Sequence, residues 1–276
     1  MSFRAILAPA SGSEEDRMVF GKAARLAAMQ GGRLKVLCAF PPPASQLAYV
    51  AAPGFYLDPR VVDEMQATHN SMKEAVNVAA AVAGQEAGLE FGRDVVIEVR
   101  DCPAWEATLA SLPLTDIVVI GPNAARGELA GDLLLNGRAP VLIAHQDLDL
   151  QSLNVAVAWD GGLHAGRAVR AALPLLRGAS RIVAIQQLAG LPPHRQATAD
   201  LSALRAYLGL WGLTVDFEEI AAEGDTGELL LEAARGCRAD LMVCGAYGHS
   251  RARELVFGGV TRTVISAGWS SVLLAH

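Results

Sequence analysis

The chain has 276 residues, of which 52% are hydrophobic but only 5% aromatic, and its formal net charge at pH 7 is -6. This length allows about two domains, and a core built from Ala, Val, Leu and Ile suits helices packed on a parallel sheet better than an aromatic-rich β-sandwich. The acidic excess lies in the first half and no basic stripe occurs, which argues against nucleic-acid binding. No apolar run approaches the roughly 18 residues of a membrane span, and the first ten residues lack the apolar stretch of a signal peptide. We therefore expect a cytoplasmic protein that does not bind membranes.

The first half opens with a strand over 4–10 (RAILAPA). Ser11-Gly12-Ser13 follows and reads as the start of a helix, with acidic residues 14–16 in its first turn. The Pro- and Ala-rich segment Pro41–Asp58 is expected to be a surface loop, either a plain excursion or a cover for a cleft or partner, before a long helix at about 60–87. Apolar runs at 116–121 (DIVVIG) and 140–145 (PVLIAH) predict two further strands.

The second half repeats this plan. Short apolar runs predict strands over 155–159, 181–186, 213–220, 241–244 and 271–275, and helical spacing predicts helices over 163–177 and 194–210. Asp225, with Glu228 three residues later, resembles a capping box and predicts the start of another helix, whose buried face should include Leu229, Leu230 and Ala233. A last helix should follow Gly258. The resulting alternation of strand and helix implies parallel strands with right-handed crossovers and helices on both faces.

Three blocks of the first half recur in the same order in the second half. DIVVIG matches DLMVCG, PVLIAH matches SVLLAH, and RAILAPA matches NVAVAWD. Ordered self-similarity of this kind indicates a duplicated domain. We therefore predict two tandem doubly wound, Rossmann-like α/β domains over 1–150 and 151–276, joined near 146–152, each with a five-stranded, mostly parallel sheet flanked by helices.

The segment after the 241–244 strand carries the strongest chemical signal. Gly245 and Gly248 are followed, nine residues later, by Gly258 and Gly259 at the start of a helix. Gly245 would let the chain turn off the strand, and the free N–H groups and dipole of a helix start favour phosphate. Three residues inside the segment could balance phosphate charge: His249, Arg251 and Arg253. The alternative is that these glycines are ordinary turn and cap residues.

This glycine pattern, with DLMVCGAYGHS before it and SVLLAH at the end, resembles the ATP signature of the universal stress protein family in its tandem two-domain form. The resemblance covers essentially the whole chain, more strongly after residue 153. It implies ATP as the ligand, with AMP or ADP and an accompanying Mg²⁺ left open. It also implies that Asp160 contacts the adenine side of the nucleotide. The full set of implied binding residues is Asp160, Cys244, Gly245, Gly248, Gly258, Gly259 and Val260.

The second half departs from the family pattern at one position. Gly259 stands where the family has Ser or Thr, so a hydroxyl contact to phosphate is missing. One neutral hydrogen bond contributes only about 0.5–1.5 kcal/mol. We therefore expect weaker phosphate binding rather than its loss, with Thr261, one helical step away, as a candidate substitute.

The first half departs further from the pattern. Its connection from Gly121 to His145 is seven residues shorter than the connection from Gly245 to His276. Residues 123–124 replace the second glycine, Asp132 would repel an incoming phosphate, and Ala10 is taken as the counterpart of Asp160. We therefore expect that the first domain does not bind ATP.

Catalytic and metal-binding patterns are weak. The chain lacks a Walker lysine pattern and metal-ligand histidine spacing, so at most a slow ATPase is expected, with Asp160 or His249 acting on water. His164 and His249 are candidates to line the cleft, and His145 and His276 end equivalent strands and suggest a structural role. The four cysteines, which form no C-x-x-C pair, are expected to be buried thiols.

The sequence thus predicts an ATP-binding stress-response protein that acts as a sensor or regulator without efficient catalysis. Two alternatives stay open: an adenine-nucleotide hydrolase of low activity, and an interaction module that binds no nucleotide. The resemblance also implies that the closing strands 140–145 and 271–276 pair, within one chain or between two chains of a homodimer. The protein partner is unknown.

Overall fold

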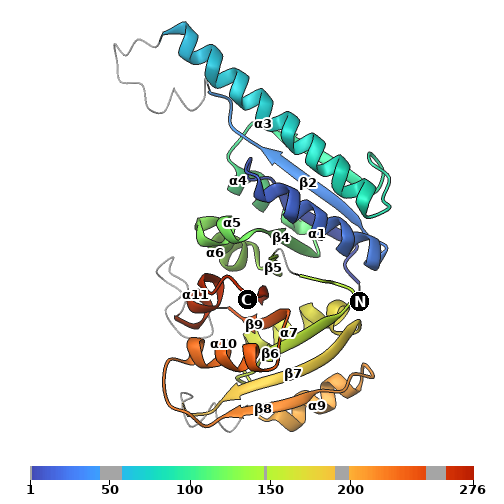
Figure 1. The fold of residues 1–276 in the computed structure, drawn as a ribbon, viewed down its shortest axis with the longest axis vertical. Helices are drawn as coiled ribbons and strands as arrows, with labels where there is room; N and C mark the ends of the chain where they lie inside the picture. Colours follow the sequence, from blue (N-terminus) through green and yellow to red (C-terminus); the bar gives the residue numbers. More distant parts are fainter. Residues whose placement is uncertain (1, 44–57, 146–147, 190–198, 247–258) are drawn as a thin grey trace. The chain divides into compact units, whose positions relative to one another are not determined.

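A computed structural model describes residues 2–43, 58–145, 148–189, 199–246 and 259–276 (Figure 1). The first half forms β1 (Ala5–Pro9), α1 (Glu15–Gln30), β2 (Arg33–Ala39), α3 (Pro59–Glu86), β3 (Val95–Arg100), α4 (Ala104–Ser111), a 3₁₀ turn η1 (Leu112–Leu114), β4 (Ile117–Ile120), α5 (Pro122–Arg126), α6 (Glu128–Asp132), a π-helical turn η2 (Leu133–Gly137) and β5 (Val141–Ile143). The second half forms β6 (Leu153–Ala158), α7 (Leu163–Leu176), β7 (Ala179–Gln187), α9 (Leu201–Gly209), β8 (Asp216–Ile220), α10 (Thr226–Gly236), β9 (Leu241–Gly245), α11 (Gly259–Ser266) and β10 (Ser271–Ala275). The predicted alternation of strands and helices, five strands to each half, is confirmed.

Contacts between residues divide the chain into two compact units. The N-terminal unit is Arg4–Asp116, and the C-terminal unit combines Met1–Phe3 with Ile117–His276. The sheet of the N-terminal unit has the strand order β3-β2-β1, and that of the C-terminal unit has the order β4-β5-β10-β9-β6-β7-β8. Thus the last two strands of the first half pack with the whole of the second half, so the compact units and the sequence repeats divide the chain at different places.

One antiparallel pair interrupts the otherwise parallel sheet of the C-terminal unit. Strand β5 pairs with β10 in the register Ile143 to Val272, Leu142 to Leu273 and Val141 to Leu274. His145 N–H then donates to Ser271 Oγ at 2.9 Å, and helix α5 contacts helix α11. The predicted pairing of the two closing strands therefore occurs within one chain, and it explains why β4 and β5 belong to the C-terminal unit.

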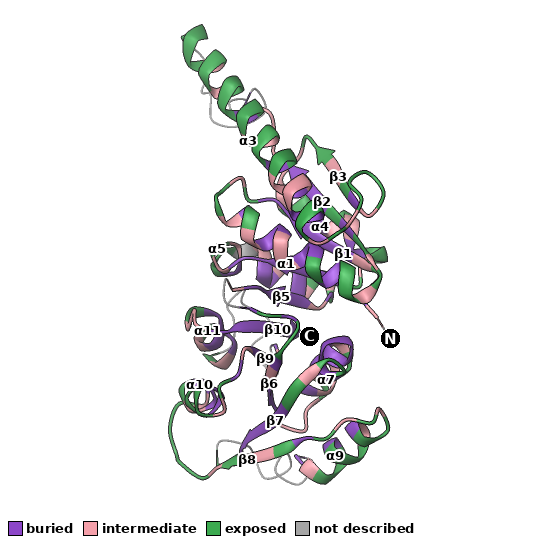
Figure 2. Cartoon of the chain, turned by 45° about the vertical axis from the view of Figure 1, so that its right-hand side comes forward, coloured by how far each residue is buried: buried purple, intermediate pink, exposed green. Residues whose placement is uncertain are grey.

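The central strands are buried, as the composition suggests. All four residues of β4 and all five residues of β10 are buried, whereas the edge strand β8 is half-buried to exposed (Figure 2). Strands covered on both faces need continuous aliphatic runs instead of alternating ones. For this reason the runs IVVI and SVLLA could be predicted as strands from the sequence.

Helix α10 begins as the sequence predicts. Asp225 is its N-cap, and the carboxylate accepts a hydrogen bond from Glu228 N–H at 3.0 Å. Its buried face includes Leu230 and Ala233 as expected, but Leu231 takes the place predicted for Leu229, which is only half-buried. The cap thus fixes where the helix starts, and packing against the rest of the fold decides which of its residues face the core.

The long helix of the first half is α3. Its buried residues begin at His69, so its first turns are exposed (Figure 2). Most of the predicted loop Pro41–Asp58 lies outside the described residues.

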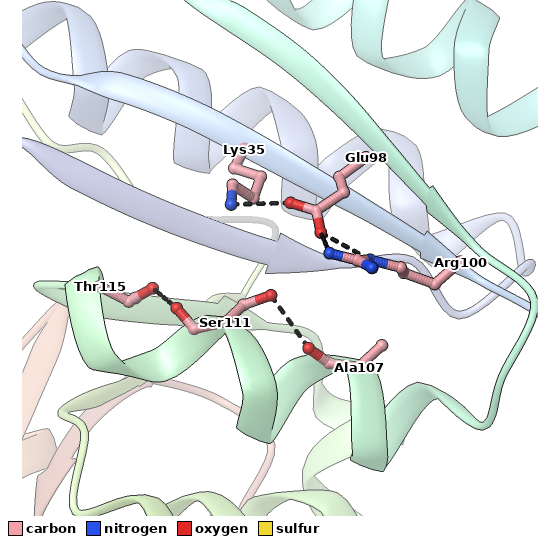
Figure 3. A network of polar contacts seen from close by, with 6 residues as sticks. All are labelled: Lys35, Glu98, Arg100, Ala107, Ser111 and Thr115. Carbon is pink, nitrogen blue, oxygen red and sulfur yellow. Dashed lines mark hydrogen bonds and ion pairs between the residues drawn. The ribbon is translucent and has the colours of Figure 1, made fainter.

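Strand β3 is the edge of the N-terminal unit's sheet, and it carries charge there (Figure 3). Glu98 lies between two cations: its carboxylate is 2.7 Å from Lys35 Nζ and 2.6 Å from a terminal guanidinium nitrogen of Arg100. The hydrogen bonds from Lys35 and Arg100 hold the pKa of Glu98 below its usual value. Charged side chains on an edge strand disfavour pairing with the edge of another sheet. This network therefore disfavours pairing of β3 with a strand of another molecule.

Candidate functional site

The strand order reverses direction at β6 in the C-terminal unit. From β6 the chain passes outward to β7 and β8, whereas β9 and β10 lie on the other side of β6. In doubly wound sheets, ligands bind beyond the carboxyl ends of the strands at such a reversal. The carboxyl ends of β6 and β9 therefore mark the candidate site.

Asp160 lies at this edge, two residues after β6. Its carboxylate accepts a hydrogen bond from Gly162 N–H at 2.8 Å, and Gly161 between them has a φ of 67°. A left-handed residue at this position favours glycine. The turn thereby holds the Asp160 side chain at the point where the sheet reverses, as the sequence predicts.

Gly245 ends β9 beside the first turn of α7. A Cβ atom at this position would lie 2.6 Å from Ala165 N and 2.6 Å from the carbonyl carbon of His164. Gly245 is not among the glycines with positive φ. Glycine is therefore required at this position not for a left-handed turn but because the backbone of α7 lies against it.

The start of α11 is the far end of the predicted phosphate segment. Gly259 is exposed, and no atom lies within 4 Å of a Cβ built on it. Thr261 is buried, with an exposed fraction of only 4%, and its role as a substitute for the missing Ser or Thr stays a prediction. Val260 is half-buried at the same helix start. Phosphate binding by the backbone N–H groups of this helix start stays a prediction.

Several predicted site residues lie outside the described residues: Gly248, His249, Arg251, Arg253 and Gly258. Their predicted roles stay predictions.

Cys244 is buried in β9 directly before Gly245. Burial raises the pKa of its thiol to about 12, so the thiol stays protonated at neutral pH. A protonated thiol is neither a nucleophile nor a metal ligand. Any contribution of Cys244 to ligand binding must therefore come from its backbone.

His164 and His276 form a stacked pair beside Gly245. Their ring centroids are 4.4 Å apart and the ring planes differ by 11°. Burial, followed by the positive charges of Arg167 and Arg138, lowers the pKa of His276. His164 thus lies beside Gly245, and whether it lines a nucleotide cleft stays a prediction. Its pairing with His276 was not predicted from the sequence.

The first half has a turn of the same geometry after β1. Ala10 N–H donates to Leu37 O at 2.9 Å, just as Trp159 N–H donates to Ile185 O at 2.9 Å. Ala10 is therefore the counterpart of Trp159, and the residue after it, Ser11, is the counterpart of Asp160. This corrects the sequence alignment by one position, and the conclusion that the first half lacks the aspartate at this point is unchanged.

The sequence predicts Asp16 only as an acidic residue in the first turn of a helix, and its contacts were not predicted. It is 5% exposed, and its carboxylate accepts hydrogen bonds from Ser11 N–H at 2.8 Å, Ser11 Oγ at 2.6 Å and Gly12 N–H at 2.9 Å. Burial raises its pKa, and these hydrogen bonds oppose the rise. An anionic side chain of the protein itself thus occupies the N–H groups of the first-half turn.

Replacing Asp16 with alanine should therefore destabilise the protein. The partly buried N–H groups of Ser11 and Gly12 would lose their acceptor, and a hydrogen bond to a charged group contributes roughly 1.5–3 kcal/mol. We expect the free energy of unfolding, measured by urea denaturation, to fall by about 2 kcal/mol. The exposed Glu14→Ala variant on the same turn is the control and should be nearly neutral; equal stability of both variants would contradict this role of Asp16.

The described ranges contain neither a metal-binding cluster of side chains nor a helix that could span a membrane. No group of three His, Cys, Asp or Glu residues in them is arranged to hold a metal ion. None of the helices in the same ranges is both long enough and apolar enough to cross a bilayer. All four cysteines are free; Cys38 and Cys244 are buried as predicted, and Cys102 and Cys237 are partly exposed.

Comparisons with known proteins agree with the duplicated fold. The sequence model of the universal stress protein family matches residues 2–143 and again residues 153–276. A universal stress protein from Archaeoglobus fulgidus has a similar structure, with a TM-score of 0.69 and 17% sequence identity over 99% of this chain and 97% of that chain. A functionally unknown protein from Pseudomonas aeruginosa PAO1 gives a TM-score of 0.60 and 14% identity over 99% of this chain and 92% of that chain.

No curated protein sequence matches the chain. The family assignment therefore depends on the two matches to the family model, which together span nearly all of the sequence, and on the likeness of fold. The chain belongs to the universal stress protein family, with one domain of that family in each half.

Proposed function

We propose that this chain is an adenine-nucleotide-binding stress protein that holds ATP in its second half and acts as a sensor or regulator. The observation that carries the proposal is the joint placement of Asp160 and Gly245 at the ends of β6 and β9. These two strands are adjacent, with Val157 paired to Val243. The glycine-containing segment between Gly245 and Gly259 starts at the same edge, at the reversal of the sheet, where phosphate groups can bind a helix start.

In this proposal the first half is a structural partner that binds no nucleotide. Ser11 replaces the aspartate at its equivalent turn, and the Asp16 carboxylate already accepts the N–H groups of that turn. The shorter connection between Gly121 and His145 supports the same conclusion. Two domains bounded near residues 146–152, and a cytoplasmic location, remain part of the proposal.

Isothermal titration calorimetry tests the proposal directly. The full chain would be titrated with ATP, AMP and ATP with Mg²⁺, and one nucleotide site per chain is expected. Absence of heat at millimolar concentrations of all three ligands would favour the alternative of an interaction module without nucleotide. Mass spectrometry of the natively purified protein for bound nucleotide is an independent check.

A low ATPase activity is the second candidate, and Asp160 is the described carboxylate at the proposed site that could act on water. Product formation would be measured with ATP and Mg²⁺ for the parent chain and for Asp160→Ala. Multiple turnovers per minute that disappear in the variant would contradict the non-enzymatic reading. Slow hydrolysis unaffected by the substitution would not come from this site.

Gly259→Ser should strengthen nucleotide binding. The position is open, so the new side chain meets no atom within 4 Å of its Cβ, and serine restores the hydroxyl of the family pattern. A single neutral hydrogen bond of about 0.5–1.5 kcal/mol corresponds to roughly 2- to 12-fold tighter binding. The dissociation constant for ATP would be measured by calorimetry. Gly259→Ala is the matched control without a hydroxyl, and equal affinities of the two variants would show that the hydroxyl does not reach the phosphate.

A further inference from the structure

A cluster of cationic and titratable side chains lies at the carboxyl end of β10 in the C-terminal unit. His276 follows β10 and stacks on His164 of α7. Arg167 lies one helical turn after His164, on the same side of α7. Arg138 lies three residues before Val141, which pairs with Leu274 at the end of β10, and its charge acts on His276. We call His164, His276, Arg167 and Arg138 the basic cluster.

The positive charge of the basic cluster comes from the guanidinium groups of Arg138 and Arg167. Among the described residues, no salt bridge involves Arg138 or Arg167. Burial lowers the pKa of His276, and the positive charges of Arg167 and Arg138 lower it further. Within the described ranges these two guanidinium groups therefore have no carboxylate of the protein in salt-bridge contact.

The backbone at Arg138 is unusual for an arginine. Its φ is 51°, in the left-handed region, although Gly137 directly before it would adopt this conformation at less cost. The π-helical turn Leu133–Gly137 directly precedes it, and Arg138 is the C-cap of that turn. Such turns and left-handed residues occur frequently at functional sites.

The cluster lies next to the proposed nucleotide site. Ala275 pairs with Gly245, Ala246 N–H donates to Ala275 O at 2.9 Å, and Gly245 packs against the backbone of His164. The cluster is therefore at the same sheet edge, one strand beyond β9 and on the side of α7. A group bound to the cluster would be beside Gly245.

We propose that the basic cluster is a phosphate-binding site in which Arg138 and Arg167 bind the anion and His276 contacts it through its imidazole. Two sources can supply this chemistry: the terminal phosphate of an ATP molecule held at the proposed site, or inorganic phosphate. The first source rests on the proposed function, and the second does not. Because Arg138 comes from the first half and the other three residues come from the second, the site requires both halves.

Nuclear magnetic resonance titration of the His276 imidazole tests the proposal on the full chain. The His276→Gln variant identifies the resonance, and the pKa is then measured in chloride and in inorganic phosphate at equal ionic strength. A bound anion favours the charged imidazolium, so the pKa should rise by about one unit in phosphate. ATP should raise it if the nucleotide is the source, and AMP, which lacks the β- and γ-phosphates, should not.

Paired variants supply the control. Arg138→Asn with Arg167→Gln removes both cations, and asparagine is suited to the left-handed backbone at residue 138. This double variant should raise the His276 pKa in chloride and abolish the response to phosphate. Arg238→Asn with Arg170→Gln changes the same charge at another left-handed arginine (φ 55°) and at an exposed position of α7, and should leave both properties unchanged.

The outcomes separate this inference from the proposed function. If ATP binds by calorimetry but neither ATP nor inorganic phosphate moves the His276 resonance, the cluster does not bind phosphate and the proposed function stands. If inorganic phosphate raises the pKa but no nucleotide binds, the cluster is a phosphate site and the proposed function is wrong. An equal loss of response in the two double variants would overturn the assignment, because the effect would then be one of net charge.

Discussion

The Gly245→Ala variant is expected to unfold with a free energy lower by about 2–3 kcal/mol than the parent, because overpacking in a close-fitting interior costs roughly 1–3 kcal/mol. The new methyl group would lie 2.6 Å from backbone atoms of Ala165 and His164. A backbone cannot move aside as the end of a flexible side chain can, so α7 would have to shift away from β9. The same shift would displace the turn that holds Asp160, and weaker ATP binding should therefore accompany the loss of stability.

Urea denaturation followed by circular dichroism measures the first effect, and calorimetry the second. Gly209→Ala is the matched control, since no atom lies within 4 Å of a Cβ at Gly209 and its φ is not positive. This control should be neutral or slightly stabilising. If Gly245→Ala is as stable as Gly209→Ala, the helix backbone near Gly245 is not the constraint that we infer.

The Asp160→Ala variant is expected to bind ATP at least about tenfold more weakly. A hydrogen bond to a charged group contributes roughly 1.5–3 kcal/mol, which corresponds to about 10- to 150-fold in affinity. The variant also removes the acceptor for Gly162 N–H, at 2.8 Å in the parent, so the turn itself is loosened. Loss of the direct contact and loss of the turn both reduce nucleotide binding.

Asp160→Asn separates these two causes. The amide oxygen of asparagine can still accept the Gly162 N–H, while the negative charge is absent. An affinity close to that of Asp160→Ala would assign the effect to the carboxylate, and an affinity close to that of the parent would assign it to the turn. Unchanged ATP binding in both variants would contradict the placement of the nucleotide at Asp160.

Much of the fold was predictable because its signals are local. Buried parallel strands need continuous aliphatic runs, and β4 and β10 are of this kind. Cap residues have equally local effects, so Asp225 marked the start of α10. The division into compact units was not predictable in this way, because it depends on contacts between β5 and β10 that are far apart in sequence.

The site was predicted in outline, and its errors have physical causes. The counterpart of Asp160 was misplaced by one residue because strand hydrogen bonds, not residue types, define the alignment of the two turns. The burial of Thr261 was not predicted, because helical rotation decides whether a residue faces solvent or the core. The roles of Asp16 and His276 depend on neighbours brought together by folding, and no short sequence pattern indicates them.

The antiparallel pairing of β5 with β10 has a consequence for the order in which the chain can fold. The bond from His145 to Ser271 joins residues 126 positions apart, so β5 is synthesised long before its partner. Until β10 is made, the backbone groups of β5 on that side form an open edge, which is prone to pairing with other chains. Late synthesis of β10 thus makes the nascent chain vulnerable to aggregation, and chaperone binding would be most useful during that interval.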